Sequence, residues 1–564
     1  MKGCGPYEYL QKVPFFMITV AQRFAETLRE IGVRYIFGVP SGSMIDYMEA
    51  IRKTQGIDFV LVSHEAGAGF MASICGRLTR IPGACFATFG PGATNVSTGI
   101  GAALLDRNPV LVFTDEMPKE KRHRCVQMNI DHKALFKPLT KWTTRLMPGK
   151  VGETLFKAAS IAVKTLPGPV YVGVPSDIGS RESREQDLLV LAAPEIRHAS
   201  PSAVKAMQES VSKAKKPVLV MGILAAQSNL KPLIQDVIEK FHLPVVLTPM
   251  AKGMVSEDHP LYVGVLNHAL ANIVGQTHSQ ADLVIGIGYD PVEVNYEDWV
   301  PPSVPIVHIS TVPADLDTNS HILAADIVGD METSLHALIS LSSMKTKWDL
   351  EALLKRKQEM FAALTPAKGS FGPLAVLQGL RQILPFDGIL TCDVGAHLHL
   401  IGQFWPTPEP DCLLMTNGWS SMGFAIPAAI AAKLCRPDKK VACVVGDGGF
   451  LMTAGELATA LRLGLHIVFI LLSDRELSLI RIKQKHKHYK AGYGTLLFEQ
   501  DLMMSETFLG IPVLTVSDPI AYRAALEKSF SLSSPVIIQA KISSTEYDDL
   551  VLKGNRVQRK FPYL

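Results

Sequence analysis

The hydrophobic positions of this chain form short continuous runs, separated by longer segments of helical periodicity. Segment 20–31 has the pattern of an amphipathic helix, and segment 66–77 that of a helix rich in small residues. The apolar runs that predict buried strands occupy residues 35–37, 57–62, 84–88, 110–114, 218–221, 245–247, 283–286, 306–309 and 388–391. Because strands and helices alternate along the chain, we expect an α/β protein built on doubly wound parallel sheets.

Two polar, irregular stretches divide this pattern. Residues 179–200 and 364–373 combine Gly, Pro, Ser and charged residues, which is typical of linkers. A chain of 564 residues is also long enough for three or four domains of ordinary size. We therefore predict three doubly wound α/β domains, at residues 1–185, 200–345 and 370–545.

The segment 441–474 carries the clearest candidate chemistry. An apolar run, 441–445, ends at the glycine turn 446–449, a helical pattern covers 451–463, and a second apolar run ends at Ser473-Asp474. In a parallel sheet both runs end at the same edge, where ligands bind in open α/β folds. The glycines permit a tight turn and the approach of a phosphate to a helix N-terminus. Asp447 and Asp474 are then hard oxygen ligands of the kind that Mg²⁺ prefers.

A simpler interpretation of the same segment stays open. Asp447 could cap the helix that follows it, and Asp474 could be an unrelated surface residue. The second carboxylate at the next strand end favours the metal–diphosphate site over this alternative.

Composition argues against several functional classes. Lys and Arg number 56 and Asp and Glu 53, so the net charge of +3 predicts no nucleic-acid or membrane partner. The eight cysteines are scattered, without a CxxC pair, and we interpret them as reduced core residues of a cytoplasmic protein. The apolar run 13–21 is short, contains Pro14 and continues into a helical pattern, so we expect no signal peptide there.

Three motifs together resemble the thiamine-diphosphate-dependent enzymes of the acetolactate synthase and pyruvate oxidase superfamily. They are GDG at 446–448 with its closing Asp474, the strand-end sequence HEAGAGFMA at 64–72, and GPGATN at 90–95. The resemblance is closest to FAD-free catabolic acetolactate synthases. It implies pyrimidine-binding, central and diphosphate-binding domains in that order, and a homodimer or homotetramer with each site between chains.

The resemblance also implies roles for individual residues. Glu65 would protonate the pyrimidine ring of the cofactor, Met422 would hold its bent shape, and Gln127 would contact the substrate. Asp447, Asp474 and the main-chain carbonyl of Glu476 would bind Mg²⁺. The implied cofactor-binding residues are Pro91, Asn95, Val394, Gly395, Ala396, His397, Ser420, Met422, Gly446, Asp447, Gly448, Gly449, Asp474, Leu477 and Ser478.

Each of the two central assignments has a structural alternative. Glu65 could only favour the dipole of the helix that it begins. Met422 could be a core methionine at a helix start.

The implied reaction begins with decarboxylation of a 2-keto acid such as pyruvate. The remaining fragment is then joined to a second carbonyl by a carboligase, or protonated to an aldehyde by a non-oxidative decarboxylase. Decarboxylases of this superfamily commonly carry an Asp in the first glycine turn and a His-His pair. The turn 40–43 here has no acid and His123 stands alone, which favours carboligation.

Two departures affect substrate positions. Met128, beside Gln127, occupies the place of a family Gln, and Lys483 that of a Trp that selects the second keto acid. A carboligase with a more anionic acceptor therefore stays open. A non-catalytic homologue is a remote alternative, because Glu65, Asp447 and Asp474 are all present.

Two further segments bear on cofactor and partner. Residues 288–293 (GYDPVE) lack the Arg-containing sequence of flavin-binding relatives, so we expect no FAD. The basic run 481–490 is interpreted as a solvated helix face, or as a site mouth that attracts an anionic substrate, with RNA binding as a remote third alternative.

Overall fold

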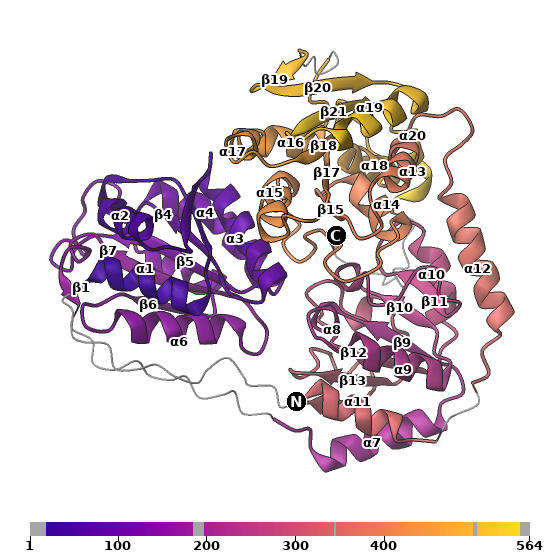
Figure 1. Cartoon of the computed structure of the whole chain (residues 1–564). Helices are drawn as coiled ribbons and strands as arrows, with labels where there is room; N and C mark the ends of the chain where they lie inside the picture. The colour runs from indigo at the N-terminus through magenta and orange to yellow at the C-terminus, as the bar shows by residue number, and fades with distance from the viewer. Residues whose placement is uncertain (1–17, 184–196, 343–345, 500–504, 553–564) are drawn as a thin grey trace, which may run out of the picture.

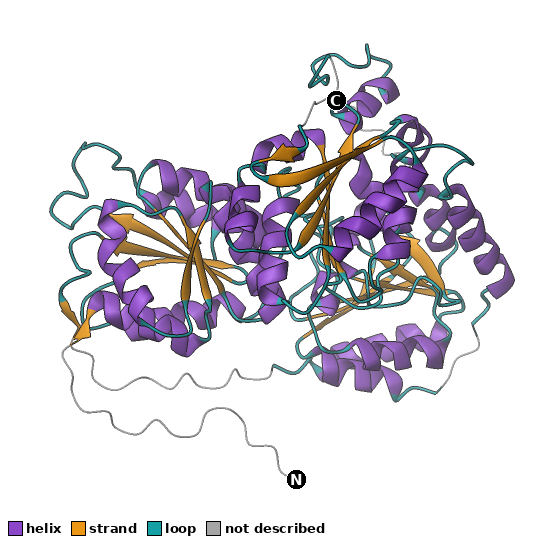
Figure 2. Cartoon of the chain, turned by 45° about the horizontal axis from the view of Figure 1, so that its top comes forward, coloured by secondary structure: helices purple, strands orange, loops and turns teal. Residues whose placement is uncertain are grey.

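The computed structural model describes residues 18–183, 197–342, 346–499 and 505–552. Within these ranges three large sheets follow one another along the chain, each between layers of helices (Figures 1 and 2). The predicted fold class, three doubly wound α/β domains, is confirmed. Each predicted domain range contains one large sheet, although most of the first linker, 184–196, lies outside the described residues.

The N-terminal sheet has six parallel strands in the order β3-β2-β4-β5-β7-β6. Its strands are β2 (Tyr35–Gly38), β3 (Asp58–Leu61), β4 (Gly83–Ala87), β5 (Val110–Glu116), β6 (Trp142–Arg145) and β7 (Pro169–Pro175), and β1 (Ile18–Thr19) pairs separately with β8 (Glu182–Ser183). The helices are α1 (Val20–Ile31), α2 (Ile45–Lys53), α3 (Glu65–Thr79), α4 (Pro91–Leu105), α5 (His132–Phe136) and α6 (Val151–Val163).

The central sheet has six parallel strands in the order β11-β10-β9-β12-β13-β14. They are β9 (Pro217–Met221), β10 (Val245–Leu247), β11 (Tyr262–Val265), β12 (Leu283–Ile287), β13 (Ile306–Ser310) and β14 (Leu323–Val328). The helices are α7 (Pro201–Lys213), α8 (Ile223–Ala226), α9 (Lys231–Phe241), α10 (Ala271–His278) and α11 (Met331–Ile339), and α12 (Leu350–Ala363) leads toward the last domain.

The C-terminal sheet has the order β16-β15-β17-β18-β21-β20-β19, with β19 antiparallel to β20. Its strands are β15 (Ile389–Cys392), β16 (Leu413–Leu414), β17 (Val441–Gly446), β18 (Ile467–Ser473), β19 (Thr507–Phe508), β20 (Ile511–Val516) and β21 (Val536–Lys541). The helices are α13 (Pro373–Ile383), α14 (Ala396–Phe404), α15 (Ala425–Cys435), α16 (Asp447–Thr453), α17 (Glu456–Arg462), α18 (Ser478–His486), α19 (Pro519–Ser531) and α20 (Thr545–Leu550).

One predicted helix is divided in the structure. The pattern 451–463 suggested a single helix, whereas α16 and α17 are separated at Ala454-Gly455. A Cβ on Gly455 would lie 3.2 Å from Cβ of Ser63, so the break coincides with close approach of the N-terminal domain. Several other strands were also absent from the predicted set, among them β6, β7, β11, β14, β16, β20 and β21. A glycine in β11 and a polar residue in β14 interrupt their short apolar runs.

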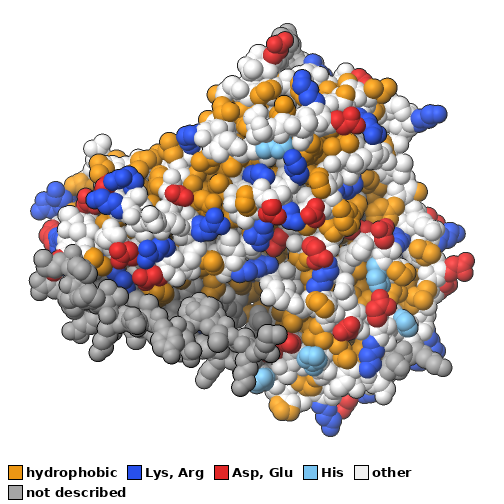
Figure 3. Space-filling model, viewed as in Figure 1, with side chains coloured by type: hydrophobic (Ala, Val, Ile, Leu, Met, Phe, Trp, Pro, Cys, Tyr) orange, Lys and Arg blue, Asp and Glu red, His pale blue; other side chains and the backbone are white. Residues whose placement is uncertain are grey.

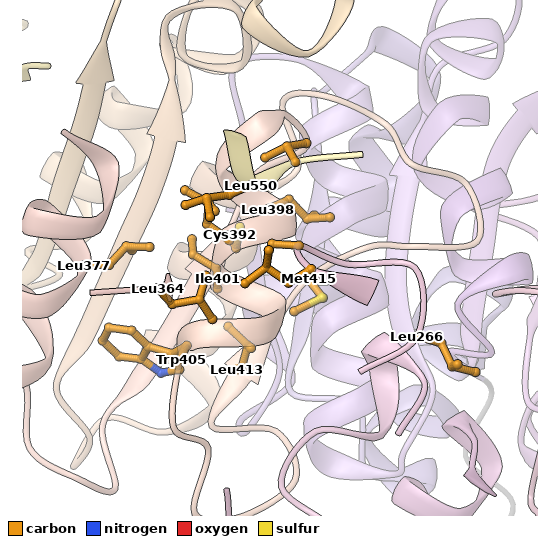
Figure 4. Close-up of a cluster of buried hydrophobic side chains, with 14 of the residues drawn as sticks. Leu266, Leu364, Leu377, Cys392, Leu398, Ile401, Trp405, Leu413, Met415 and Leu550 are labelled. Atoms are coloured by element: carbon orange, nitrogen blue, oxygen red, sulfur yellow. The ribbon is translucent and has the colours of Figure 1, made fainter. Parts of the chain in front are cut away.

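Small residues pack two helices of the N-terminal domain together, and ion pairs join the domains. A Cβ on Gly99 of α4 would lie 2.6 Å from Cα of Gly69 of α3, so these helices meet backbone to backbone. Arg77 pairs with Asp411 of the C-terminal domain at 2.6 Å. Arg107 pairs with Asp290 of the central domain, also at 2.6 Å. One buried hydrophobic cluster runs on from the central domain into the C-terminal domain, where Ile401, Leu413 and Trp405 pack together (Figure 4).

The surface shows no strong segregation of charge. On the face drawn in Figure 3, basic and acidic side chains are interspersed with apolar ones, in agreement with the small net charge. No helix in the described ranges has both the length and the hydrophobicity needed to span a bilayer.

Candidate functional site

The carboxyl edge of the C-terminal sheet brings the two predicted metal ligands together. Asp447 follows β17, and Asp474 follows the neighbouring parallel strand β18. Oδ2 of Asp447 accepts hydrogen bonds from the amide nitrogens of Asp474 at 2.9 Å and Arg475 at 2.7 Å. The glycine turn and the second strand end are therefore fixed to each other by a buried carboxylate.

Asp474 lies in a setting that disfavours its negative charge. Burial raises its pKa to about 6, and the neighbouring charge of Asp447 acts in the same direction. The Ser478 hydroxyl donates to Oδ2 of Asp474 at 2.5 Å and partly offsets this effect. No cluster of three or more His, Cys, Asp or Glu side chains suited to a metal occurs among the described residues. Two neighbouring carboxylates suit Mg²⁺, which keeps much of its coordination for water and substrate oxygens.

A cradle of close contacts surrounds the glycine turn. A Cβ on Gly448 would lie 2.6 Å from Cε of Met422 and 2.7 Å from Cδ2 of Leu477, so both side chains close over the turn. A Cβ on Gly446 would lie 3.3 Å from the ring of His397. These contacts bring five residues from four separate segments together at the glycine turn, and any side chain in place of Gly448 would clash with Met422 and Leu477.

His397 supplies an observation that points to a ligand. It lies in the first turn of α14, after Val394, Gly395 and Ala396, and its Nε2 is buried without a hydrogen-bond partner among the described residues. Burial lowers its pKa to about 4, so the ring is neutral at pH 7 and Nε2 can serve as donor or acceptor. An unpaired buried nitrogen is costly unless a ligand satisfies it. The group that the family resemblance implies therefore fits the residues present.

The remaining predicted residues of this domain lie around the same edge. Gly449 is in the first turn of α16. The Glu476 carboxylate accepts a hydrogen bond from Nε of Arg481 at 2.6 Å. Ser420 is exposed with a φ of 52°, and its hydroxyl donates to the Asn417 carbonyl at 2.6 Å. Arg475 has a φ of 69°, so non-glycine residues adopt left-handed backbone both before Met422 and after Asp474.

A second cluster lies in the N-terminal domain. Glu65 is the first residue of α3 and only 8% exposed, and its Oε2 accepts a hydrogen bond from Nδ2 of Asn95 at 3.0 Å. Pro91 begins α4, which carries Asn95, and a Cβ on Gly92 would lie 3.2 Å from Oε1 of Glu65. The structure thus brings together the predicted residues of the HEAGAG and GPGATN motifs.

The substrate segment differs from the expectation in detail. Gln127 and Met128 are both exposed, and the backbone of Met128 packs against the GPGATN turn, since a Cβ on Gly90 would lie 2.6 Å from the Met128 carbonyl oxygen. Met128 also has a φ of 62°. The role of Gln127 stays a prediction, and Met128 is the residue of this pair nearer to the pyrimidine motif.

Comparison with known proteins agrees with this geometry. Models of the thiamine pyrophosphate enzymes match the N-terminal TPP binding domain at residues 18–135, the central domain at 204–338 and the C-terminal TPP binding domain at 393–540. The acetolactate synthase large subunit of Parasynechococcus marenigrum is 30% identical over 490 residues, 82% of this chain and 77% of the relative. The chain belongs to the thiamine pyrophosphate enzyme family.

Other relatives match over nearly their whole length. Acetolactate synthase of Bacillus subtilis is 28% identical over 555 residues, 96% of both chains. Acetolactate synthase isozyme 1 large subunit of Escherichia coli is 28% identical over 539 residues, 94% of both. This family member is therefore a thiamine-diphosphate-dependent enzyme of the acetolactate synthase type.

Two buried carboxylates of this thiamine pyrophosphate enzyme, Asp393 and Asp115, were not predicted from the sequence. Asp393 follows β15 and accepts hydrogen bonds from the amides of Val394 at 2.7 Å, Gly423 at 3.0 Å and Ala425 at 3.2 Å. Asp115, near the end of β5, accepts hydrogen bonds from the hydroxyls of Ser41 and Ser43. Both acids stand at the end of an apolar run, the signal that identified Asp447, and the same rule applied throughout would have found them.

Asp115 lies beside the first glycine turn, residues 40–43. That turn contains no acidic residue, but the fully buried carboxyl group of Asp115 in β5 lies 3.0 Å from the Ser41 hydroxyl. Burial raises the pKa of Asp115 to about 6, and hydrogen bonds from Ser41 and from the Phe89 amide oppose the shift. The turn is therefore accompanied by a carboxyl group that exchanges its proton near pH 6.

The raised pKa of Asp115 predicts a pH dependence of stability. The folded state binds this proton more tightly than the unfolded state, so its contribution to stability is lost as pH rises from about 4 to about 6. Two pKa units correspond to about 3 kcal/mol. Relative to wild type, Asp115→Asn should become more heat-stable as pH rises through this window, measured by thermal unfolding between pH 4 and pH 7. Parallel curves for both proteins, as expected for the exposed control Asp58→Asn, would contradict the assignment.

Proposed function

We propose that this chain is a Mg²⁺- and thiamine-diphosphate-dependent carboligase of the acetolactate synthase type. It would decarboxylate a 2-keto acid such as pyruvate and transfer the remaining fragment to a second carbonyl. The observation that carries the proposal is the convergence of Asp447, Asp474, His397 and Met422 at one sheet edge, each from a motif implied to bind the cofactor. Acetolactate synthase relatives over almost the whole chain support the reaction type.

The residues at this edge have distinct proposed tasks. Asp447, Asp474 and the Glu476 carbonyl would hold Mg²⁺, while Gly446, Gly448, Gly449, Val394, Gly395, Ala396, His397, Ser420, Leu477 and Ser478 would surround the cofactor. When bound, thiamine diphosphate supplies an electron sink for the pair released as a 2-keto acid loses CO₂. Met422 and Leu477 pack against Gly448 and would shield the bound cofactor from water, which would strengthen the electrostatic interactions there.

Glu65 is the proposed proton carrier of the N-terminal cluster. Asn95 fixes the carboxyl group through Oε2, which leaves Oε1 for exchange of a proton with the ligand. Pro91 begins the helix that positions Asn95, so this part of the site depends on α4 being in place. General acid–base groups that are held in this way contribute about 10²–10⁴-fold to rate.

We further propose that no flavin takes part and that the protein is cytoplasmic. Asp290 of the 288–293 segment pairs with Arg107, and the partly buried Glu293 accepts hydrogen bonds from the Thr248 hydroxyl at 2.6 Å and the Met250 amide at 2.8 Å. The first contact joins two domains and the other two lie within the central domain. The segment is thus used for packing, which supports the absence of a flavin site. The scattered cysteines, free throughout the described ranges, support the cytoplasmic location.

A non-oxidative decarboxylase is the second candidate, and Asp115 favours it. Such an enzyme must protonate the fragment left after CO₂ departs, and a buried acid beside Ser41 and Ser43 is a proton source at the turn that lacked one in the sequence. Transfer to a more anionic acceptor is the third, supported by Lys483 on α18. Arg481 of the same basic run is already paired with Glu476 and Asp548, so it contributes less free positive charge.

The products of pyruvate turnover test this proposal. With thiamine diphosphate and Mg²⁺, we expect acetolactate, with two pyruvates consumed for each CO₂, measured by mass spectrometry. Acetaldehyde with one CO₂ for each pyruvate would favour the decarboxylase, and product only with a dicarboxylic acceptor would favour the third candidate. Glu65→Gln should lower kcat by about 10²–10⁴-fold, whereas Glu153→Gln, on exposed α6 surface, should leave it unchanged.

The site is proposed to lie between two chains of a homodimer or homotetramer. Helix α4 starts at the Asn95 cluster, and Asp106, at its end, accepts hydrogen bonds from the amides of Asn417 and Gly418, in the loop before Met422. At 1.5 Å per residue these helix ends are about 20 Å apart. This separation supports completion of each half-site by a second copy.

Complementation of two inactive variants tests this arrangement. Glu65→Gln and Asp447→Asn should each abolish most activity alone. Co-expressed, they should restore about a quarter of wild-type activity, because half of randomly formed dimers are mixed and each holds one intact site. A mixture as inactive as its components would place each site within one chain.

A further inference from the structure

Two cysteines from different domains meet inside the molecule. Cys75 lies in α3 of the N-terminal domain, and Cys435 is the last residue of α15 in the C-terminal domain. Their sulfur atoms are 3.1 Å apart, and the residues are 6% and 9% exposed. A disulfide bond is about 2.0 Å long, so bond formation requires an approach of about 1 Å.

Contacts on both sides hold the two helices in register. The rings of Phe70 in α3 and Phe424, which precedes α15, meet edge to face with centroids 5.8 Å apart. Beyond the cysteines, the Arg436 guanidinium donates to the Leu78 carbonyl at 2.6 Å. The sulfur pair is thus held together by the native packing and does not depend on a rare fluctuation.

A small cavity gives access to the pair. It has a volume of about 50 Å³, and its lining includes both cysteines, Arg34, Tyr35, Thr79 and Ile81. A water molecule needs only about 10–15 Å³ by this measure, so a molecule as small as hydrogen peroxide can be accommodated. The other buried cysteines of the described chain, such as Cys85 and Cys443, are fully enclosed in strands.

The surroundings also favour a reactive sulfur. The hydrogen bond with Cys75 lowers the pKa of Cys435 against the opposing effect of burial, and the positive charges of Arg436 and Arg34 also lower it. The thiolate is the nucleophilic form of cysteine, and its population rises as the pKa falls. Cys75, whose pKa is raised by the same hydrogen bond and by burial, remains a thiol until its partner has reacted.

We propose that Cys75 and Cys435 are a reversible oxidation site, which forms a disulfide between the N-terminal and C-terminal domains when a peroxide enters the cavity. The Cys435 thiolate attacks one oxygen of the peroxide, the O–O bond breaks, and water leaves after protonation, which produces a sulfenic acid. The Cys75 sulfur then attacks the Cys435 sulfur, the S–O bond breaks, and the Cys75 proton leaves in a second water. Two thiols are oxidised, one peroxide is reduced to two waters, and a dithiol reductant reverses the change.

The crosslink would act on the two helices that bear the functional clusters. Cys75 shares α3 with Glu65, and α15 begins shortly after Met422. The disulfide would join residues 360 positions apart, so it restricts the unfolded chain strongly and ties the two domains together. We expect the oxidised protein to resist unfolding more than the reduced protein does.

Peptide mapping of the full-length protein tests the site directly. After exposure to hydrogen peroxide, alkylation and trypsin digestion, peptide 54–77 should be found linked to peptide 434–439, and dithiothreitol should separate them. The apparent Tm should rise by at least about 2 °C on oxidation. Both changes should persist in Cys85→Ser and Cys125→Ser and disappear in Cys75→Ser and Cys435→Ser.

Several outcomes would overturn the proposal. They are oxidation of Cys435 to sulfinic acid without a linked peptide, a crosslink through other cysteines only, or a correct crosslink that leaves Tm unchanged. Because the wild-type chain is mapped first, the result does not depend on the folding of any serine variant.

Discussion

The carboxylate of Asp393 is the contact on which the arrangement of the candidate site depends most. It is fully buried and receives amide hydrogen bonds from its own segment and from the turn after Met422. The glycine turn presses on it from a third side, because a Cβ on Gly449 would lie 2.7 Å from its Cγ. Three segments that are distant in sequence therefore meet at one side chain, before any ligand is bound.

Burial of the Asp393 carboxylate costs free energy and requires particular hydrogen-bond donors. Burial raises its pKa to about 6, while the amide donors favour the charged form. A buried carboxylate is tolerated only when such donors are present, so displacement of any of the three segments leaves charge unsatisfied. The three segments that meet at Asp393 therefore have one arrangement of low free energy. That arrangement places Met422, His397 and Asp447 around the glycine turn 446–449.

The local pattern of apolar and polar residues was sufficient to predict the fold class and the carboxylates at the ends of two strands. The runs before Asp447 and Asp474 became neighbouring parallel strands, so their carboxylates meet as expected. Contacts between distant segments could not be predicted in this way. Glu456 accepts amide hydrogen bonds from Ser63 and His64, almost 400 positions earlier, and the helix breaks beside it for that packing. The contact of Asp115 with the first glycine turn is another example. It depends on the order of strands in the sheet, which brings β5 near β2 and cannot be read from a single sequence.

The most direct test of the central claim is calorimetric titration of the protein with thiamine diphosphate, with and without Mg²⁺, for wild type and Asp393→Asn. The account predicts metal-dependent binding by wild type. It predicts affinity weakened by about tenfold or more in Asp393→Asn, because one charge-assisted hydrogen bond contributes about 1.5–3 kcal/mol. The exposed control Asp387→Asn should bind as wild type does. Equal affinity of Asp393→Asn and wild type, or no binding by wild type with Mg²⁺ present, would contradict the account.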